Sequence, residues 1–427
     1  MKKKLFSVLI CISMLIAFAA CGGNGDAGGD ASADDGAQSG TDSSSQEDFL
    51  VGIIQPLTGP NGYVGTEAKA ALEIAGDEQK TLMGRPLKLI FADAPDDTTA
   101  TSEVERLMSV QGVKFFIGAY GFSSIPIQAA VMKNGGFMYE TVTWETDLLK
   151  GGYENYFMDM VTAEGFANTH ADYVLQLGKE YLGKDADELR VGILGNTGFP
   201  SAMPSIVKAR LEALGCPPVV YEIYDENLSD FTPIITKLKA AECDIVIPSQ
   251  FPPDADKFRK TCKSLGYEPP VIFATGVAYD QPDFAQIGEA AEGCMTLCYT
   301  TPAIREDSSK GLKEFKDSFY EKTGHYPLTH ALIAYRGIKN FFQAVENAGS
   351  DDYEKIRQAI YDLDIAPGDT PAYWGVKFNP ETNQNERAGD PLVIGQWFAD
   401  GNGDYEFRVV YPKELATTDM VIPFGGR

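Results

Sequence analysis

Histidine is scarce in this sequence, and the spacings that mark common catalytic motifs are missing. The 427 residues include only three histidines, and no HExxH pair is present for a catalytic zinc. The sequence also lacks a GxSxG nucleophile elbow, a GxGxxG dinucleotide loop and a glycine-rich loop followed by the lysine of a P-loop. We therefore expect no enzymatic activity, no bound metal and no cofactor.

Cysteines are few, and their spacing suits neither disulfides nor zinc. Five follow position 21, an odd number, and no CxxC pair occurs. Cys294 and Cys298 fall in one strand-like segment, which separates them by about 13 Å, too far for a bond. We expect five buried thiols: Cys216, Cys243, Cys262, Cys294 and Cys298.

Basic residues are outnumbered, with 36 lysines and arginines against 61 acidic residues and a net charge of −25. A nucleic-acid-binding protein presents a basic stripe, so this balance argues against a nucleic-acid partner. It also argues against adsorption to anionic lipid by charge alone. We interpret the acidity as a property that keeps the protein soluble.

One apolar run stands at the N-terminus. Lys2, Lys3 and Lys4 precede Leu5 to Ala20, a stretch shorter than the roughly 20 residues that span a bilayer. This pattern predicts a secretory signal peptide over residues 1–20. Phe18-Ala19-Ala20-Cys21 is typical of a lipobox, although Phe18 replaces the usual leucine, and predicts that Cys21 is lipidated. An ordinary signal peptide with an incidental cysteine is the alternative.

The segment after Cys21 has no residue that could build a core. Residues 22–47 are glycine, alanine and small or acidic polar residues, a composition typical of flexible chain. We therefore predict a lipidated cysteine and linker over residues 21–48. A diacyl anchor with this tether would hold a folded domain outside the cytoplasm, attached to the cell membrane.

The remaining residues are too many for one ordinary core, and their pattern alternates between strands and helices. Alternation at this spacing predicts βαβ units, and its restart near residue 189 predicts two doubly wound, Rossmann-like α/β lobes. The predicted strands are 49–54, 87–91, 114–120, 137–144, 190–194, 219–224, 244–247 and 271–274. The predicted helices include 66–79, 124–133, 203–214, 232–241 and 254–265.

Three loops follow predicted strands at the edge where doubly wound sheets bind ligands. Gly59 to Gly65 carries Tyr63. Gly121 to Pro126 leads into a helix, where free N–H groups, the helix dipole and two serine hydroxyls would suit a carboxylate. Ser124 could equally serve only as the cap of that helix. Thr141 to Trp144 ends in an aromatic residue that could also belong to the core.

Asp400 to Asp404 imitates the start of a calcium-binding loop. Tyr405 stands where the loop requires glycine, and Tyr411 where it requires a bidentate glutamate. Strand-like residues 393–398 and 405–410 flank the segment. We therefore predict a hairpin turn.

Several short segments occur in the order found in one protein family. They are Val51-Gly52-Ile53 with Pro56 to Pro60 (PLTGP), residues 84–89, 113–124 and 288–293, Ala334-Tyr335, and residues 344–349. From about residue 49 to 415 the chain resembles the branched-chain amino-acid-type (leucine-binding-protein-like) periplasmic binding proteins of ABC importers, with the type I fold. The resemblance implies a ligand cleft between lobes joined by three crossings, which we place near Thr162, Tyr299 and Pro367.

These crossings would give an N-terminal lobe of residues 49–162 with 300–366 and a C-terminal lobe of residues 163–299 with 367–427. The family's acidic residue for the ligand's ammonium group falls on Gly276, four residues before Asp280. We therefore expect a small carboxylate with an apolar body rather than a zwitterionic amino acid, unless Asp280 or Glu140 serves as counter-ion. The predicted ligand-binding residues are Tyr63, Phe122, Ser123, Ser124, Val142, Thr143, Trp144, Phe199, Phe251 and Gly276.

The sequence thus predicts an extracytoplasmic solute-binding lipoprotein, a monomer that delivers a small amino acid or carboxylate to ABC permease subunits. A ligand-sensing receptor of the same fold is the alternative, because a fold alone does not fix function. A lipid anchor without a transmembrane helix after the domain favours transport.

Overall fold

The computed structural model describes residues 47–59, 61–118, 120–197, 202–225, 227–276 and 278–422. The predicted signal peptide, Cys21 and nearly all of the predicted linker lie outside these ranges, as does Phe199. The described residues belong to one compact unit, which extends from Gln46 to Arg427. Among its described helices, none combines the length and the apolar character needed to cross a membrane.

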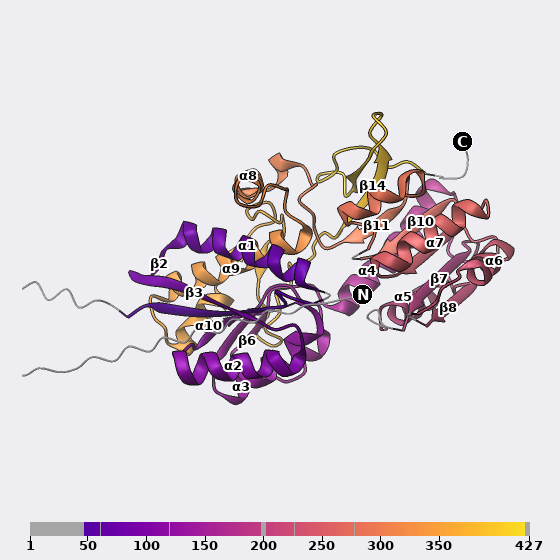
Figure 1. The fold of residues 1–427 in the computed structure, drawn as a ribbon. Helices are drawn as coiled ribbons and strands as arrows, with labels where there is room; N and C mark the ends of the chain where they lie inside the picture. The colour runs from indigo at the N-terminus through magenta and orange to yellow at the C-terminus, as the bar shows by residue number, and fades with distance from the viewer. Residues whose placement is uncertain are drawn as a thin grey trace, which may run out of the picture. The chain divides into compact units, whose positions relative to one another are not determined.

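The first sheet has six strands in the order β2-β3-β1-β4-β5-β6. All neighbours pair in parallel except β2 and β3. Helices α1 and α9 cover one face, and α2 and α3 cover the other (Figure 1). The strands are β1 (Phe49–Gln55), β2 (Thr81–Leu82), β3 (Arg85–Asp93), β4 (Phe115–Ile117), β5 (Phe137–Glu140) and β6 (Tyr156–Met158). The helices are α1 (Gly62–Gln79), α2 (Asp97–Gln111), α3 (Ser124–Lys133) and α9 (Thr329–Ala348).

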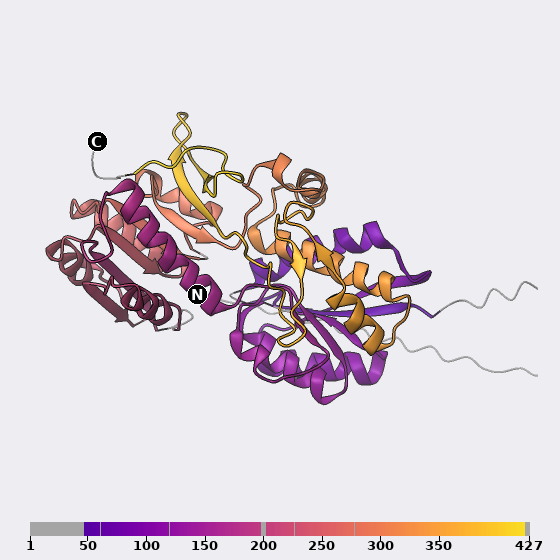
Figure 2. The ribbon, with the colours of Figure 1, turned by 180° about the vertical axis from the view of Figure 1, so that it is seen from behind.

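The second sheet has seven strands in the order β15-β14-β11-β10-β9-β7-β8, of which β14 and β15 run antiparallel to their neighbours. Figure 2 shows α4 along one side of this sheet, where it packs on α5. The strands are β7 (Val191–Asn196), β8 (Val220–Tyr224), β9 (Ile245–Ser249), β10 (Val271–Thr275), β11 (Met295–Cys298), β14 (Val393–Ala399) and β15 (Tyr405–Tyr411). The helices are α4 (Ala163–Tyr181), α5 (Ala202–Ala213), α6 (Thr232–Ala240) and α7 (Pro252–Ser264).

Shorter elements complete the unit. They are α8 (Leu312–Thr323), α10 (Tyr353–Tyr361), the strand pair β12 (Asp364–Ile365) and β13 (Val376–Lys377), and the 3-10 turns η1 (Gly121–Ser123), η2 (Thr146–Leu149), η3 (Pro282–Ala290) and η4 (Glu306–Ser308).

Two parallel-sheet lobes confirm the predicted fold class, and most elements lie where the periodicity placed them. The strand predicted over 137–144 is shorter, because β5 ends at Glu140. The backbone N–H groups of the next three residues turn back to the Glu140 carboxylate instead of continuing a ladder. Helix α1 begins at Gly62, four residues earlier than predicted.

The hairpin and the thiols are confirmed. Strands β14 and β15 pair across the turn, where Asp400 accepts hydrogen bonds from the backbone N–H groups of Asn402 and Asp404 at 2.7 and 3.0 Å. The described residues hold no group of three metal-ligating side chains. All five cysteines of the described unit are buried free thiols.

The predicted lobe boundaries remain predictions, and one local observation bears on the third crossing. The backbone N–H of Met158 in β6 donates to Asn383 at 2.9 Å, and that of Asn385 donates back to Met158 at 2.9 Å. Residues 383–385 therefore pair with the first sheet. This pairing favours a crossing later in the chain than Pro367.

Candidate functional site

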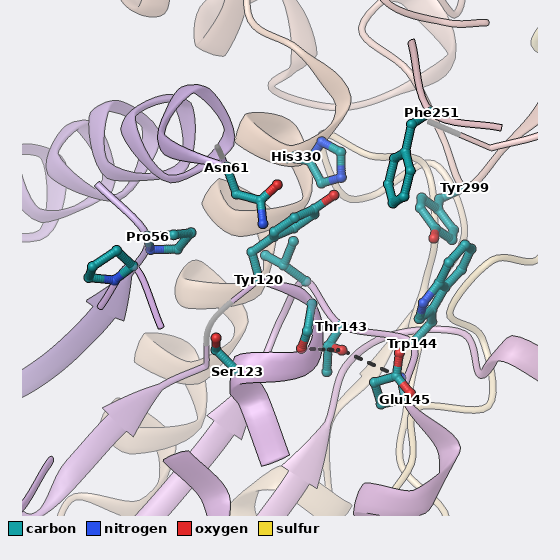
Figure 3. A pocket seen from close by; sticks show the side chains of 13 residues that line it. Pro56, Asn61, Tyr120, Ser123, Thr143, Trp144, Glu145, Phe251, Tyr299 and His330 are labelled. Carbon is teal, nitrogen blue, oxygen red and sulfur yellow. Dashed lines mark hydrogen bonds between the residues drawn. The ribbon is translucent and has the colours of Figure 1, made fainter. Parts of the chain in front are cut away.

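A cavity of about 160 Å³ lies beyond the carboxyl ends of β1, β4 and β5. Loops after these strands supply most of its lining, the start of α9 supplies His330, and Phe251 enters from the residue preceding α7 (Figure 3). Tyr299 follows β11 and also reaches the cavity. Segments from both lobes therefore meet at one site, at the edge where parallel sheets place ligands.

Five aromatic rings form one part of the cavity wall (Figure 3). Trp144 meets Tyr299 edge to face at a centroid distance of 5.4 Å, and Tyr120 meets His330 in the same way at 5.1 Å. Phe251 is the partly exposed member of the group, with 39% of its surface accessible. Such a wall suits a ligand with an apolar body or a cationic group.

Polar groups form another part of the lining. The Thr143 hydroxyl donates to the Gly121 carbonyl at 3.3 Å and accepts the backbone N–H of Glu145 at 3.4 Å. The Ser123 hydroxyl donates to Asp97 at 3.2 Å. Burial, and then the charge of Asp147, raises the pKa of Glu145, while the Trp144 indole N–H opposes the shift by donating to this carboxylate.

Glu140 lies fully buried beneath the loop that carries Val142 and Thr143. Its Oε1 accepts the backbone N–H groups of residues 141, 142 and 143 at 2.9, 3.1 and 3.4 Å. Burial raises the pKa of Glu140 to about 7, against the opposing effect of these N–H groups and of the Ser124 hydroxyl. Gly118 is required beside it, because a Cβ there would lie 2.2 Å from Oε2.

Five of the predicted ligand-binding residues line the cavity: Ser123, Val142, Thr143, Trp144 and Phe251. Ser124 is fully buried at the first position of α3, where its hydroxyl bonds to Glu140. Tyr63 lies on α1 with 46% of its surface accessible and does not line the cavity.

Gly276 follows β10 with a φ of +65°, which favours glycine, and a Cβ built on it would lie 3.8 Å from the Trp144 ring. Phe199 and the side chain of Phe122 lie outside what the structure describes. The ligand contacts of all ten residues stay predictions.

Several lining residues were not among the predicted ligand-binding residues, although Asn61 lies in the Gly59 to Gly65 loop that the sequence marked; the others include Glu145, Tyr299 and His330. Burial lowers the pKa of His330 to about 4, and its Nδ1 has no hydrogen-bond partner. Asp280 accepts a hydrogen bond from the Thr329 hydroxyl, next to the lining residue His330, and burial raises its pKa. Tyr120, by contrast, ends a segment that the sequence already marked as strand-like.

Two α/β lobes around a cavity with aromatic rings are typical of proteins that bind a small ligand between their lobes. Comparison of the sequence with protein-family models identifies the family of this chain. Residues 50–402 match the sequence model of a family described as Periplasmic binding protein. The chain belongs to this family of extracytoplasmic binding proteins, as its resemblance predicted. The family consists of binding proteins rather than enzymes, in agreement with the missing catalytic motifs.

One relative is a Leu/Ile/Val-binding protein homolog from Brucella abortus, 29% identical over 381 residues, which cover 87% of this chain and 93% of the relative. The fold is similar to a Streptococcus pneumoniae branched-chain amino acid transporter substrate-binding protein solved with isoleucine (TM-score 0.69, 16% identity, 86% of this chain and 100% of that one). It is equally similar to a Rhodopseudomonas palustris ABC transporter solute-binding protein solved with 3,4-dihydroxybenzoic acid (TM-score 0.69, 18% identity, 89% and 99%).

Proposed function

We propose that this protein is the solute-binding lipoprotein of an ABC importer. It captures a small amino acid or carboxylate in the cavity and delivers it to permease subunits. The observation that carries the proposal is the cavity itself, since Phe251 faces it from one lobe and Tyr120, Val142 and Trp144 line it from the other. A ligand held between them favours the conformation in which the lobes meet around it.

The comparisons support this class of ligand without fixing its identity. One protein of similar fold was solved with isoleucine and another with 3,4-dihydroxybenzoic acid. The same fold therefore accommodates amino acids and aromatic acids, and side chains at the cavity decide between them. In our proposal Cys21 carries the lipid, and the segment up to residue 48 tethers the binding unit to the membrane.

A thermal-shift screen of amino acids, amines and aromatic and aliphatic carboxylates tests the proposal. A ligand that binds only the folded protein stabilises it by about 2.7 kcal/mol at one hundred times its Kd. We expect at least one of these classes to raise the Tm. The same ligand should decrease the radius of gyration in small-angle scattering, because the lobes close on it.

The variant Trp144→Ala tests whether the ligand that raises the Tm binds in this cavity. Removing the ring should weaken binding by about 1–3 kcal/mol through lost burial and stacking. Failure of every class to raise the Tm would contradict the proposed function. Binding that is indifferent to Trp144→Ala would place the ligand elsewhere.

A further inference from the structure

Both serine hydroxyls that the sequence assigned to a ligand carboxylate are engaged by the protein's own acidic side chains, and so are three backbone N–H groups of the loop after β5. The Ser124 hydroxyl and the N–H groups of residues 141–143 bond to Glu140. The Ser123 hydroxyl donates to Asp97 at 3.2 Å. A carboxylate ligand at this end of the cavity would have to compete with Glu140 and Asp97 for these donors.

The cavity also offers no positive charge to a carboxylate. Its described lining contains no lysine and no arginine, and neither type occurs among the internal residues that the structure leaves undescribed. His330 is the one ionisable nitrogen of the described lining, and it is neutral near pH 7 because burial lowers its pKa to about 4. A buried anion without a counter-charge is strongly disfavoured.

Negative charge, by contrast, is present at the cavity. Glu145 lines it, and the charges that act on this carboxyl group are those of two further acids, Asp147 and Glu164. Asp280 accepts a hydrogen bond from the Thr329 hydroxyl, next to His330, and burial raises the pKa of its carboxyl group. A cation that entered the cavity would therefore be attracted chiefly by Glu145, which lines it, because the exposed Asp147 carboxylate already pairs with Lys150 at 2.6 Å.

The aromatic rings of the wall also favour a cationic ligand over an anionic one. Tyr120, Trp144 and Tyr299 surround the space next to Glu145, and Phe251 faces it from the other lobe (Figure 3). The faces of such rings attract cations, and alkylated ammonium groups are the ligands that aromatic cages of this kind select. The ring wall and the carboxylate thus point to one kind of ligand group.

We propose that the ligand carries a positively charged nitrogen, an ammonium or alkylated ammonium group, which lies among these rings with Glu145 as its counter-ion. The inference rests on the proposed function, the capture of a small solute in this cavity, and specifies the charge that the solute carries. It revises the expectation from the sequence, because a ligand whose only charge is a carboxylate has no counter-charge here. It also places the counter-ion on the loop after β5 rather than at the position of Gly276.

Calorimetry at pH 7.5 with two matched series tests the inference. One series is leucine, isoamylamine and 4-methylpentanoate, and the other is phenylalanine, phenethylamine and 3-phenylpropanoate, with tetramethylammonium as an alkylated probe. We expect probes with a charged nitrogen to bind at least tenfold more tightly than the acid of the same series. This comparison uses the wild-type protein, so it does not depend on the folding of any variant.

Glu145→Gln should weaken the binding of the best cationic probe tenfold or more. Asp147→Asn is the matched control, since it makes the same change of charge two residues away, at an exposed side chain paired with Lys150 at 2.6 Å. This control should change the affinity less than twofold.

An acid that binds as tightly as its amine, or a Glu145→Gln variant with unchanged affinity, would overturn the inference and leave the proposed function standing. If neither the cationic nor the anionic probes bind, the proposed function fails together with the inference.

Discussion

Glu140 illustrates how much one buried carboxyl group decides at this site. The residues around Glu140 in the sequence do not indicate its role. In the fold it lies beneath the cavity, and its carboxylate accepts hydrogen bonds from three backbone N–H groups of the loop above. Local sequence could identify Ser123 and Ser124 as hydroxyl donors at the start of a helix. It could not predict that Asp97 and Glu140, which come from other elements, would accept from them.

Glu140 should make the stability of the protein depend on pH. The pKa of Glu140 is about 7 in the folded protein, above the ordinary value of about 4.3 that we expect in the unfolded chain. The folded state therefore binds this proton more tightly, and the resulting stabilisation is complete below about pH 4.3 and lost as the pH rises to about 7. The loss corresponds to about 3 kcal/mol.

Glu140→Gln isolates this contribution, because the amide stays neutral and keeps a carbonyl oxygen as acceptor. We expect the unfolding free energy of wild type, relative to the variant, to fall by about 3 kcal/mol between about pH 4 and pH 8. His170 and His330, whose pKa values burial lowers to about 3 and about 4, have the opposite pH dependence. They are present in both proteins and cancel in the difference. Parallel pH profiles from urea titrations would contradict the assignment.

Whole strands and helices were the features best predicted from the sequence. Helix α3 has the predicted bounds, Ser124–Lys133, because its apolar spacing and its flanking glycines agree with the packing. The position of the segment after β12 was harder to predict from the sequence, because this segment contacts residues that lie far from it in the chain. Asn385 reaches Asp159 at 2.7 Å, across more than two hundred residues.

Asp159 and Arg336 join β6, α9 and this late segment through an ion pair of 2.9 Å, with both side chains fully buried. Tyr139 and Asn340 donate to the same carboxylate at 2.7 and 2.9 Å. Removing one charge of such a pair leaves the other buried and uncompensated. We therefore expect Asp159→Asn to lower the unfolding free energy by about 3–5 kcal/mol in urea titrations.

The control for this substitution is Asp317→Asn, which breaks an exposed pair between Asp317 and Lys313 on α8. Exposed pairs contribute about 0–1 kcal/mol, so Asp317→Asn should change the unfolding free energy by no more than this amount. Combining Asp159→Asn with Arg336→Met removes the remaining buried charge and should recover part of the loss. A loss at Asp159 no larger than at Asp317 would show that the buried pair does not stabilise the fold.

At the scale of the whole molecule, the ordered set of short segments was enough to predict the family and the two-lobed fold. The wall of the cavity was not predictable in the same way. Glu145, Tyr299 and His330 come from three distant parts of the chain. No local pattern distinguishes them from other loop or helix residues, and only the folded chain brings them together.

Membrane attachment is a property of the whole molecule. Because Cys21 lies outside the described residues, the prediction of this attachment rests on the sequence alone. The apolar leader before it and the core-free linker after it make lipidation of Cys21 our prediction. Cys21→Ser should remove the site of lipidation and release the protein into the medium, as measured by cell fractionation. The released protein should bind ligand with unchanged Kd, because the described lining of the cavity belongs to the unit that follows the tether.

Cys11→Ser is the matched control for this experiment. Cys11 lies inside the apolar leader, is removed with it in our prediction, and should leave membrane attachment intact. Uptake of the ligand by cells should fall with Cys21→Ser and stay normal with Cys11→Ser, since a binding protein lost to the medium no longer delivers its ligand at the membrane. A Cys21→Ser protein that stays as firmly bound to the membrane as wild type would contradict the lipoprotein assignment, whatever its affinity for ligand.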